Sequence, residues 1–201
     1  MGSFYASLYD ALMKPIEQVR FNRMRKDLVG KAEGRVLEIG SGTGLNFKHY
    51  QNVSQIDAIE PDRSMGMRSI RQAKKRNFPI HVYDAVAENL PFEDNSFDSV
   101  VGTLVFCTIP DPEKALQEIR RVCKPGARIL LFEHVRMDQQ LLAKAQDLAT
   151  PLWKKAFAGC HLNRDTLELV KQGGLQVTKA QPSFRSLFLT IEAVEAKKRN
   201  S

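Results

Sequence analysis

Two acidic residues and a short glycine cluster have the types and spacing that suit a nucleoside site. Glu38 lies two residues before the first glycine of Gly40-Ser41-Gly42-Thr43-Gly44, and Glu60 follows twenty residues after Gly40. Glycine lets the backbone approach a ligand closely and take a positive φ angle, which a Cβ atom obstructs. An ionised carboxylate offers two acceptor oxygens for the paired hydroxyls of a ribose. The pattern therefore predicts a nucleoside site, with a tight turn that holds no ligand as the alternative.

The spacing of the glycines separates the classes of nucleotide site. A dinucleotide site requires G-x-G-x-x-G, and Leu45 stands where that pattern needs its third glycine. No Lys-Ser or Lys-Thr pair follows the glycines, which excludes a P-loop. The carboxylate of Glu38 would repel a pyrophosphate, whereas it suits a ligand that carries an ammonium and a sulfonium. A nicotinamide oxidoreductase is therefore disfavoured.

These residues need a sheet that brings several strand ends together. The apolar residues Val36, Leu37 and Ile39 precede the glycines and predict a strand buried on both faces. Further strands are expected at 55–59, 79–83, 95–110, 128–132, 175–180 and 187–193, the last two as antiparallel neighbours. Helices are expected at 45–50, 62–76, 111–122, 139–157 and 166–172. Because ligands bind at the carboxyl ends of strands in open α/β sheets, the glycines and Glu60 are expected at one edge.

Several segments in order resemble class I S-adenosylmethionine-dependent methyltransferases. They are Glu38–Gly44, Asp84–Phe92, Ser96-Phe97-Asp98 and Leu116–Gly126, and the resemblance covers residues 34–135. It implies an α/β, Rossmann-like, seven-stranded and mostly parallel sheet with helices on both faces and an antiparallel last strand. It also implies S-adenosyl-L-methionine as the cofactor. A protein that binds this cofactor without catalysis is an alternative that the sequence leaves open.

The resemblance assigns a set of residues to the cofactor. At the position where many members of the family carry an aspartate that meets the adenine amino group, this chain has Val86, and Asp84 is two residues away. Adenine is therefore expected to be held mainly by the backbone of Ala87 and Glu88. The full expected set is Tyr9, Glu38, Gly40, Ser41, Gly42, Gly44, Glu60, Pro61, Ala87, Glu88, Thr103 and Leu104.

One domain of 201 residues is expected, with three parts. Residues 1–33 are interpreted as an N-terminal helical lid, 34–135 as the cofactor-binding core, and 136–201 as acceptor-side helices and C-terminal strands. Tyr9 belongs to the lid, whose aromatic residues have packing against the sheet edge as their alternative role.

A narrower resemblance, to the group that contains thiol S-methyltransferases, concerns the acceptor. It is carried by Thr103–Cys107, Phe132–Val135 and Gly159–Arg164. It implies a thiol acceptor. The apolar residues of 104–109 and 139–157 are expected to line the acceptor pocket, which favours a small lipophilic molecule with a thiol, a phenol or quinol, or an amine. His134, at the end of the fifth strand, is the candidate catalytic base, and its alternative role is a hydrogen bond to a neighbouring loop. Cys107 and His161 are weaker candidates.

Composition limits the other classes of function. The net charge is +7, but no base-flipping motif is present, so no specific nucleic-acid partner is expected. No apolar run approaches the ~20 residues that span a bilayer, which leaves peripheral membrane contact open. The three cysteines match neither a disulfide framework nor a zinc spacing, so no metal is expected. With no secretory signal, a cytoplasmic location is expected, and the oligomeric state is left open.

Overall fold

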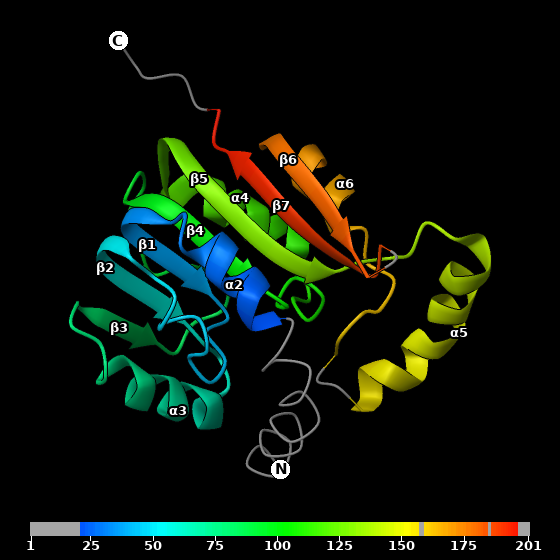
Figure 1. Cartoon of the computed structure of the whole chain (residues 1–201), viewed down its shortest axis with the longest axis horizontal. Coiled ribbons are helices and arrows are strands. Elements are labelled where there is room, and N and C mark those ends of the chain that lie inside the picture. Colours follow the sequence, from blue (N-terminus) through cyan, green and yellow to red (C-terminus); the bar gives the residue numbers. More distant parts are fainter. Residues whose placement is uncertain (1–20, 157–158, 185, 197–201) are drawn as a thin grey trace.

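The computed structural model describes residues 21–156, 159–184 and 186–196. One seven-stranded sheet has the order β3-β2-β1-β4-β5-β7-β6 (Figure 1). Strands β3, β2, β1, β4 and β5 run parallel, and β7 is antiparallel to both β5 and β6. The expected mostly parallel sheet with an antiparallel last strand is confirmed. The strands are β1 Glu33–Ile39, β2 Asn52–Ile59, β3 Ile80–Tyr83, β4 Phe97–Thr103, β5 Cys123–His134, β6 Gln176–Ser183 and β7 Phe188–Val194.

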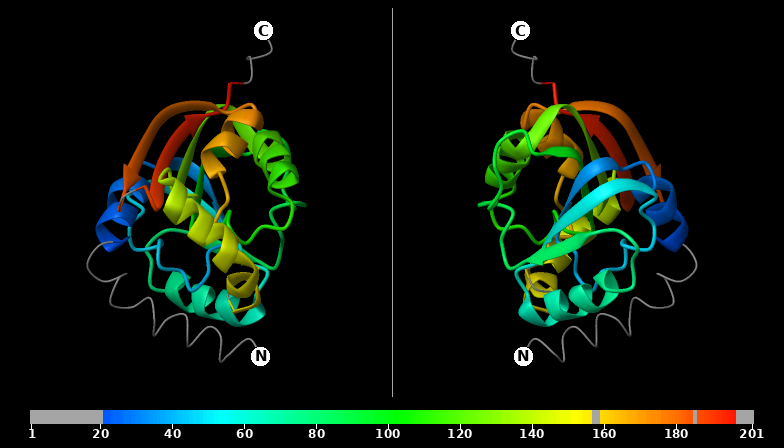
Figure 2. Two further views of the ribbon diagram at one scale, coloured as in Figure 1. Left: turned by 90° about the vertical axis from the view of Figure 1, so that its right-hand side faces the viewer. Right: turned by 90° about the vertical axis from the view of Figure 1, so that its left-hand side faces the viewer.

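Helices cover both faces of the sheet. They are α2 Asn22–Val29, α3 Arg63–Ala73, α4 Pro112–Val122, α5 Gln140–Ala156 and α6 Thr166–Gln172. Helices α4 and α6 pack beside each other, whereas α5 extends to one side of the sheet (Figures 1 and 2). The side chains of Asp62, Asp111 and Asp165 accept hydrogen bonds from backbone amides in the first turns of α3, α4 and α6. These caps satisfy donors that a helix start leaves unpaired, which fixes where each helix begins.

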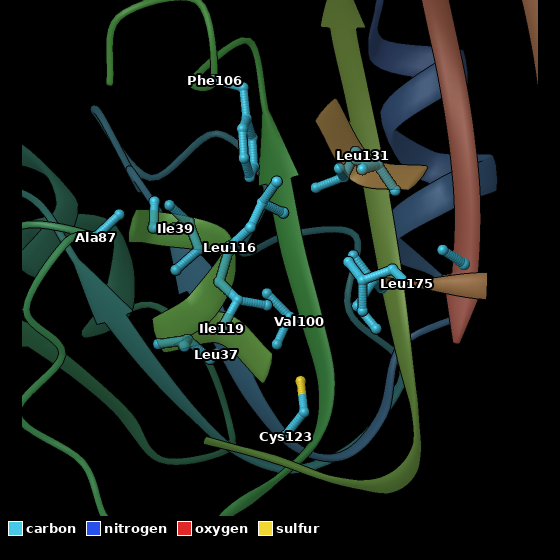
Figure 3. Packing of buried hydrophobic residues seen from close by; sticks show 14 of the residues in the cluster. Leu37, Ile39, Ala87, Val100, Phe106, Leu116, Ile119, Cys123, Leu131 and Leu175 are labelled. Carbon is cyan, nitrogen blue, oxygen red and sulfur yellow. The ribbon is translucent and has the colours of Figure 1, made fainter. Parts of the chain in front are cut away.

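The core has one apolar cluster on each face. Leu37, Ile39 and Val100 of the strands pack with Leu116 and Ile119 of α4 (Figure 3). On the opposite face, alternate strand residues pack against α2, and this second cluster includes Leu28, Val36, Ile56, Val101 and Leu130. Successive strand residues point to opposite faces, so a parallel strand covered on both sides needs apolar residues at almost every position. That requirement explains why Val36, Leu37 and Ile39 of β1, and Val100 and Val101 of β4, are all apolar.

The order in which strands are added to the sheet changes direction at β1. Strands β2 and β3 lie on one side of β1, and β4 and β5 lie on the other side. Chain segments leave the carboxyl ends of β1 and β4 in adjacent positions, the arrangement that leaves room for a ligand in α/β sheets. Among the described residues, no helix has both the length and the hydropathy needed to cross a bilayer.

Three sequence-based expectations about elements were wrong. Residues 45–49 form turns where a helix over 45–50 was expected, and the amide of His49 donates to the carbonyl of Asn46. Strand β4 ends at Thr103 rather than near residue 110. Helix α5 continues through Pro151, which was expected to interrupt it. Of the N-terminal helical lid expected over residues 1–33, the second helix was expected to run to about Val29, and α2 ends there; the part before residue 21, with Tyr9, lies outside the described residues.

Candidate active site

The glycine turn after β1 leaves space for a ligand beside its backbone. Gly40, Gly42 and Gly44 have φ angles of 64°, 54° and 82°. The amide of Ser41 donates to the carbonyl of Ile59 at 3.0 Å, which ties the turn to the end of β2. A Cβ atom at Gly42 would meet nothing within 4 Å, so this glycine faces open space rather than packed protein. The turn therefore fits a nucleoside cofactor held close to the backbone.

Glu60 lies at the end of β2, with its carboxylate turned back to the glycine turn. Its oxygens accept hydrogen bonds from the amides of Gly42 at 2.8 Å and Asp62 at 2.9 Å. The residue is buried, and burial raises its pKa while the two amides lower it. A carboxylate oxygen has two lone-pair positions, so each can still accept a hydroxyl. Pro61, the next residue of the expected set, is exposed.

Glu38 lies in a buried polar network rather than at an open surface. Its carboxylate accepts hydrogen bonds from the Tyr50 hydroxyl at 2.7 Å and from Asn46 Nδ2 at 3.0 Å. Burial raises the pKa of Glu38 to about 7, against the lowering effect of these two donors and of Arg25. The sequence-based interpretation paired this acid directly with a cationic ligand. The structure places Asn46 and Tyr50 around it.

The network continues to β4 and α2. Asn46 Nδ2 also donates to Thr103 Oγ1 at 3.0 Å, and Arg25 Nη1 donates to Asn46 Oδ1 at 2.9 Å and to Thr103 Oγ1. Arg25, Asn46 and Tyr50 were not among the expected site residues. Arg25 carried a signal, because it lies at helical spacing between Phe21 and Leu28 on an otherwise apolar face. A buried arginine there needs polar partners, and the network supplies them.

The chain turns sharply after β4. Leu104 has a φ angle of 56°, unusual for a residue with a branched side chain, and its amide donates to the carbonyl of Phe132 at 2.7 Å. Such conformations persist only where the surroundings over-determine them, and they gather at functional sites. The next amide, of Val105, donates to the buried carboxylate of Glu133 at 3.1 Å. Burial raises the pKa of Glu133 to about 7. Because Gly102 pairs with Ile39 of β1, Thr103 and Leu104 lie near the glycine turn.

The segment expected to hold adenine is fixed by α4. Glu118 accepts from the amide of Leu90 at 2.8 Å, and Arg121 donates to the carbonyls of Leu90 and Phe92. Ala87 is buried, and Glu88 accepts from the amide of Asp111 at 3.2 Å. Val86 is exposed, as is the nearby Asp84.

His134 lies at the end of β5 and contacts a loop. Its Nε2 atom is 3.0 Å from the sulfur of Cys160, so the loop contact considered as the alternative role is present. The Cys107 sulfur lies close by, within 4.8 Å of the ligand atoms of the other two. A hydrogen bond with Cys107 lowers the pKa of Cys160 to about 5, and His134 acts in the same direction against the effect of burial. The wide spacing of the cysteines along the chain gave no sign of this cluster.

The expected lining of the acceptor pocket is only partly present. Phe106 and Ile109, which follow β4, are buried in the core. The leucines of α5 face solvent instead, with Leu141 84% and Leu152 75% exposed. The buried positions of this helix include the polar residues Gln146 and Thr150. Trp153 is 37% exposed, and Phe157 lies outside the described residues.

Comparison with known proteins adds to this geometry. A family model described as a methyltransferase domain matches residues 37–131. Thiol S-methyltransferase TMT1B of Rattus norvegicus is 34% identical over 174 residues, which cover 81% of this chain and 70% of that protein. The chain belongs to the class I S-adenosylmethionine-dependent methyltransferases. Its cofactor is accordingly S-adenosylmethionine, and the open space at Gly42 with the carboxylate of Glu60 fits that group.

Two further relatives widen the comparison for this methyltransferase. A phosphatidylethanolamine N-methyltransferase of Cereibacter sphaeroides is 30% identical over 147 residues, which cover 69% of this chain and 72% of that protein. A solved structure of a SAM-dependent methyltransferase from Aquifex aeolicus has a TM-score of 0.66 at 17% identity, covering 96% of this chain and 98% of that one. At that identity the solved structure shows the fold alone.

Proposed function

We propose that this methyltransferase methylates the sulfur of a thiol on a small lipophilic molecule. The carrying observation is the start of the segment after β4, where the partly exposed residues Leu104 and Val105 are apolar and Val105 lies against the glycine turn. An acceptor with a full charge would lose water there without gaining a partner. The name of the rat relative, a thiol S-methyltransferase, supports the same class of acceptor.

The cofactor supplies, when bound, an electrophilic methyl group on a sulfonium. In our proposal Glu60 binds the ribose hydroxyls, and the turn at Gly40, Ser41, Gly42 and Gly44 lies against the nucleoside. The backbone at Ala87 and Glu88 holds adenine, and Thr103 and Leu104 lie near the methyl. Glu38 acts through Asn46 and Tyr50. Positioning of this kind can supply ~7–11 kcal/mol of a barrier, so the transfer needs few chemical residues.

The acceptor must also lose its proton. We assign His134 to this part of the reaction, because it lies at the carboxyl end of β5, next to the strand that carries Thr103. Assistance with deprotonation is typically worth ~10²–10⁴-fold in rate. An amine acceptor is the second candidate, favoured by the relative named as a phosphatidylethanolamine N-methyltransferase.

A panel of acceptors tests the proposal. Alkyl and aryl thiols, phenols, quinols and amines are assayed with the purified chain, and the best acceptor is repeated with His134→Ala. We expect thiols to give the highest kcat/KM. The variant should lose about 10²-fold or more in kcat with cofactor binding unchanged. His81→Ala, at an exposed position on β3, is the matched control and should keep the wild-type rate.

Three results would count against parts of this account. Turnover of only polar amino-acid or nucleotide acceptors would contradict the apolar site. A preference for amines would select the second candidate. A normal rate for His134→Ala would remove that residue from the reaction and leave the acceptor class standing.

A further inference from the structure

Three side chains from distant parts of the chain converge beside the candidate active site. Cys107 follows β4, His134 ends β5, and Cys160 lies in the loop between α5 and α6. One ligand atom from each lies within 4.8 Å of the other two. Both cysteines are buried, and His134 is partly buried. Two sulfurs and a ring nitrogen therefore lie close together at a position that is buried apart from the partly exposed His134.

Hydrogen bonds to backbone carbonyls hold the three residues in this arrangement. The amide of His161, next to Cys160, donates to the carbonyl of Cys107 at 2.8 Å. Gln146 Nε2 donates to the carbonyls of Val135 at 3.2 Å and Leu162 at 3.0 Å. The loop that carries Cys160 is thus bonded both to the segment after β4 and to the residue after His134. One backbone hydrogen bond and the side-chain amide of Gln146 thus hold the loop beside Cys107 and His134.

The donor set selects a class of cation. Two thiolates and an imidazole suit Zn²⁺ and other thiophilic transition metals, whereas Ca²⁺ and Mg²⁺ require oxygen ligands. Three protein ligands are the number found in zinc sites that keep one position open for water or substrate. A divalent cation would also neutralise two thiolates, which are costly to bury as unpaired charges.

The place of the cluster connects it with methyl transfer. Val105, two residues before Cys107, contacts the glycine turn so closely that a Cβ atom on Gly40 would lie 2.4 Å from Val105 Cγ2. The segment that carries Cys107 therefore touches the turn that fits the cofactor. A group bound by the cluster would lie at the same edge of the sheet.

We propose that Cys107, His134 and Cys160 bind one Zn²⁺ ion, and that the acceptor thiol occupies its fourth coordination position as a thiolate. The second half rests on the proposed function. The acceptor S–H bond breaks as the zinc–sulfur bond forms, and the proton passes to solvent. The acceptor sulfur then uses a lone pair to bond the methyl carbon. The bond between that carbon and the cofactor sulfur breaks, and its electrons stay on the cofactor sulfur, which becomes a neutral thioether. A coordinating thiol is deprotonated without a separate base, which is how His134 would assist.

Metal binding is tested first, independently of activity. The full chain is purified under reducing conditions, stripped with a chelator and titrated with Zn²⁺, with the stoichiometry checked by elemental analysis. We expect one ion per chain. Replacement by Co²⁺ should give the intense visible bands of a tetrahedral site and a thiolate-to-metal charge-transfer band. The variants Cys107→Ser, Cys160→Ser and His134→Gln should each weaken binding at least ~100-fold, since even the loss of an outer partner costs 10–100-fold.

Cys123→Ser is the matched control. Cys123 is a buried cysteine that pairs with Phe97 at the start of β4, whereas Cys107 follows the end of that strand. Figure 3 shows Cys123 far from Phe106, the residue before Cys107. This variant should bind Zn²⁺ as the wild type does. Cofactor binding by calorimetry shows which variants remain folded. If Co²⁺ gives no thiolate band, if Zn²⁺ binding survives in Cys107→Ser, or if the reduced protein re-forms a Cys107–Cys160 disulfide instead of taking up metal, the site is refuted.

Activity separates the two halves of the proposal. The stripped protein should lose at least ~10²-fold in thiol methylation and recover it on addition of one equivalent of Zn²⁺. A stripped protein that methylates thiols at the full rate would refute acceptor activation and leave the proposed function intact. If the zinc-loaded protein methylates no thiol, the proposed function fails, and so does acceptor activation by zinc. The measured number of zinc ions per chain still shows whether the metal site exists.

Discussion

At the level of single residues, Glu38 is balanced between its charged and neutral forms. Burial disfavours its carboxylate, while Asn46, Tyr50 and Arg25 favour it. The result is a pKa of about 7 in the folded chain, above the ordinary value of 4.5. A carboxyl group with a raised pKa binds its proton more tightly when folded, so its contribution to stability falls as pH rises between these two values.

Glu38→Gln should therefore change how stability depends on pH. The difference in unfolding free energy, variant minus wild type, should grow by about 3 kcal/mol between pH 4 and pH 8, because the glutamine never pays for a buried charge. Chemical denaturation of the cofactor-free proteins at several pH values measures it. Glu93→Gln, at an exposed position, is the control and should follow the wild type. Parallel curves for Glu38→Gln and wild type would show that this carboxylate carries no such penalty.

The sequence could predict site residues that directly follow a strand. It could not predict residues that reach the site only through tertiary contacts between distant segments. Gly42 and Glu60 follow strand ends, so the order of elements was enough to bring them together. Asn46 and Tyr50 belong to a stretch that was interpreted as a helix, because a mixed run of polar and apolar residues begins at Leu45. In the structure both side chains donate hydrogen bonds to Glu38, and the stretch between them forms turns. Cys107 and Cys160 meet through a loop whose path no local pattern specifies.

At the level of elements, the glycine turn is the part whose conformation matters most. Gly42 and Gly126 both have positive φ angles, 54° and 80°, and a Cβ atom at either would meet nothing within 4 Å. Gly42 lies at the candidate site. Gly126 lies near the start of β5, away from the site, and its amide donates to the backbone carbonyl of Glu195. Substitution of each glycine by alanine strains the backbone, but only the substitution at Gly42 also fills space where a ligand could bind.

Alanine at each glycine should cost about 1–2 kcal/mol of stability, the price of a left-handed conformation for a residue with a Cβ atom. Only Gly42→Ala should also lose cofactor affinity, because its methyl group would occupy the space left for the nucleoside. Calorimetry with S-adenosylhomocysteine, together with thermal unfolding, gives both quantities. Equal affinity in the two variants would mean that the cofactor does not lie against Gly42.

The elements themselves were largely predictable. Helix α6 has the expected bounds, and α4 and α5 lie within a residue or so of theirs, because capping aspartates and apolar periodicity are local signals. Strand ends were less predictable. The apolar run after Thr103 reads as a continuing strand, but the hydrogen bond from Leu104 to Phe132 turns the chain away from the sheet. Tertiary contacts decide such boundaries.

At the scale of the whole molecule, the basic charge is a surface property. Arg63 and Arg71 of α3, with Lys74 and Lys75 after it, are exposed on one side of the sheet. Such a surface attracts polyanions through counterion release and carries no sequence information.

Association with RNA or DNA should therefore be weak and steeply dependent on salt. Fluorescence anisotropy with a labelled oligonucleotide, at low and at physiological salt, measures it. We expect micromolar or weaker binding that falls sharply as salt rises. A nanomolar complex that survives at physiological salt would contradict this and point to a dedicated nucleic-acid surface.

In the proposed function, the chain moves a methyl group from its cofactor to the sulfur of a lipophilic thiol. The direct test uses S-adenosylmethionine with a deuterated methyl group, a hydrophobic thiol and the purified chain, followed by mass spectrometry of the products. The account predicts a thioether that carries the intact deuterated methyl, formed in equal amount to S-adenosylhomocysteine. Cofactor binding with no labelled thioether from any thiol, or label found only in polar or nitrogen acceptors, would contradict it.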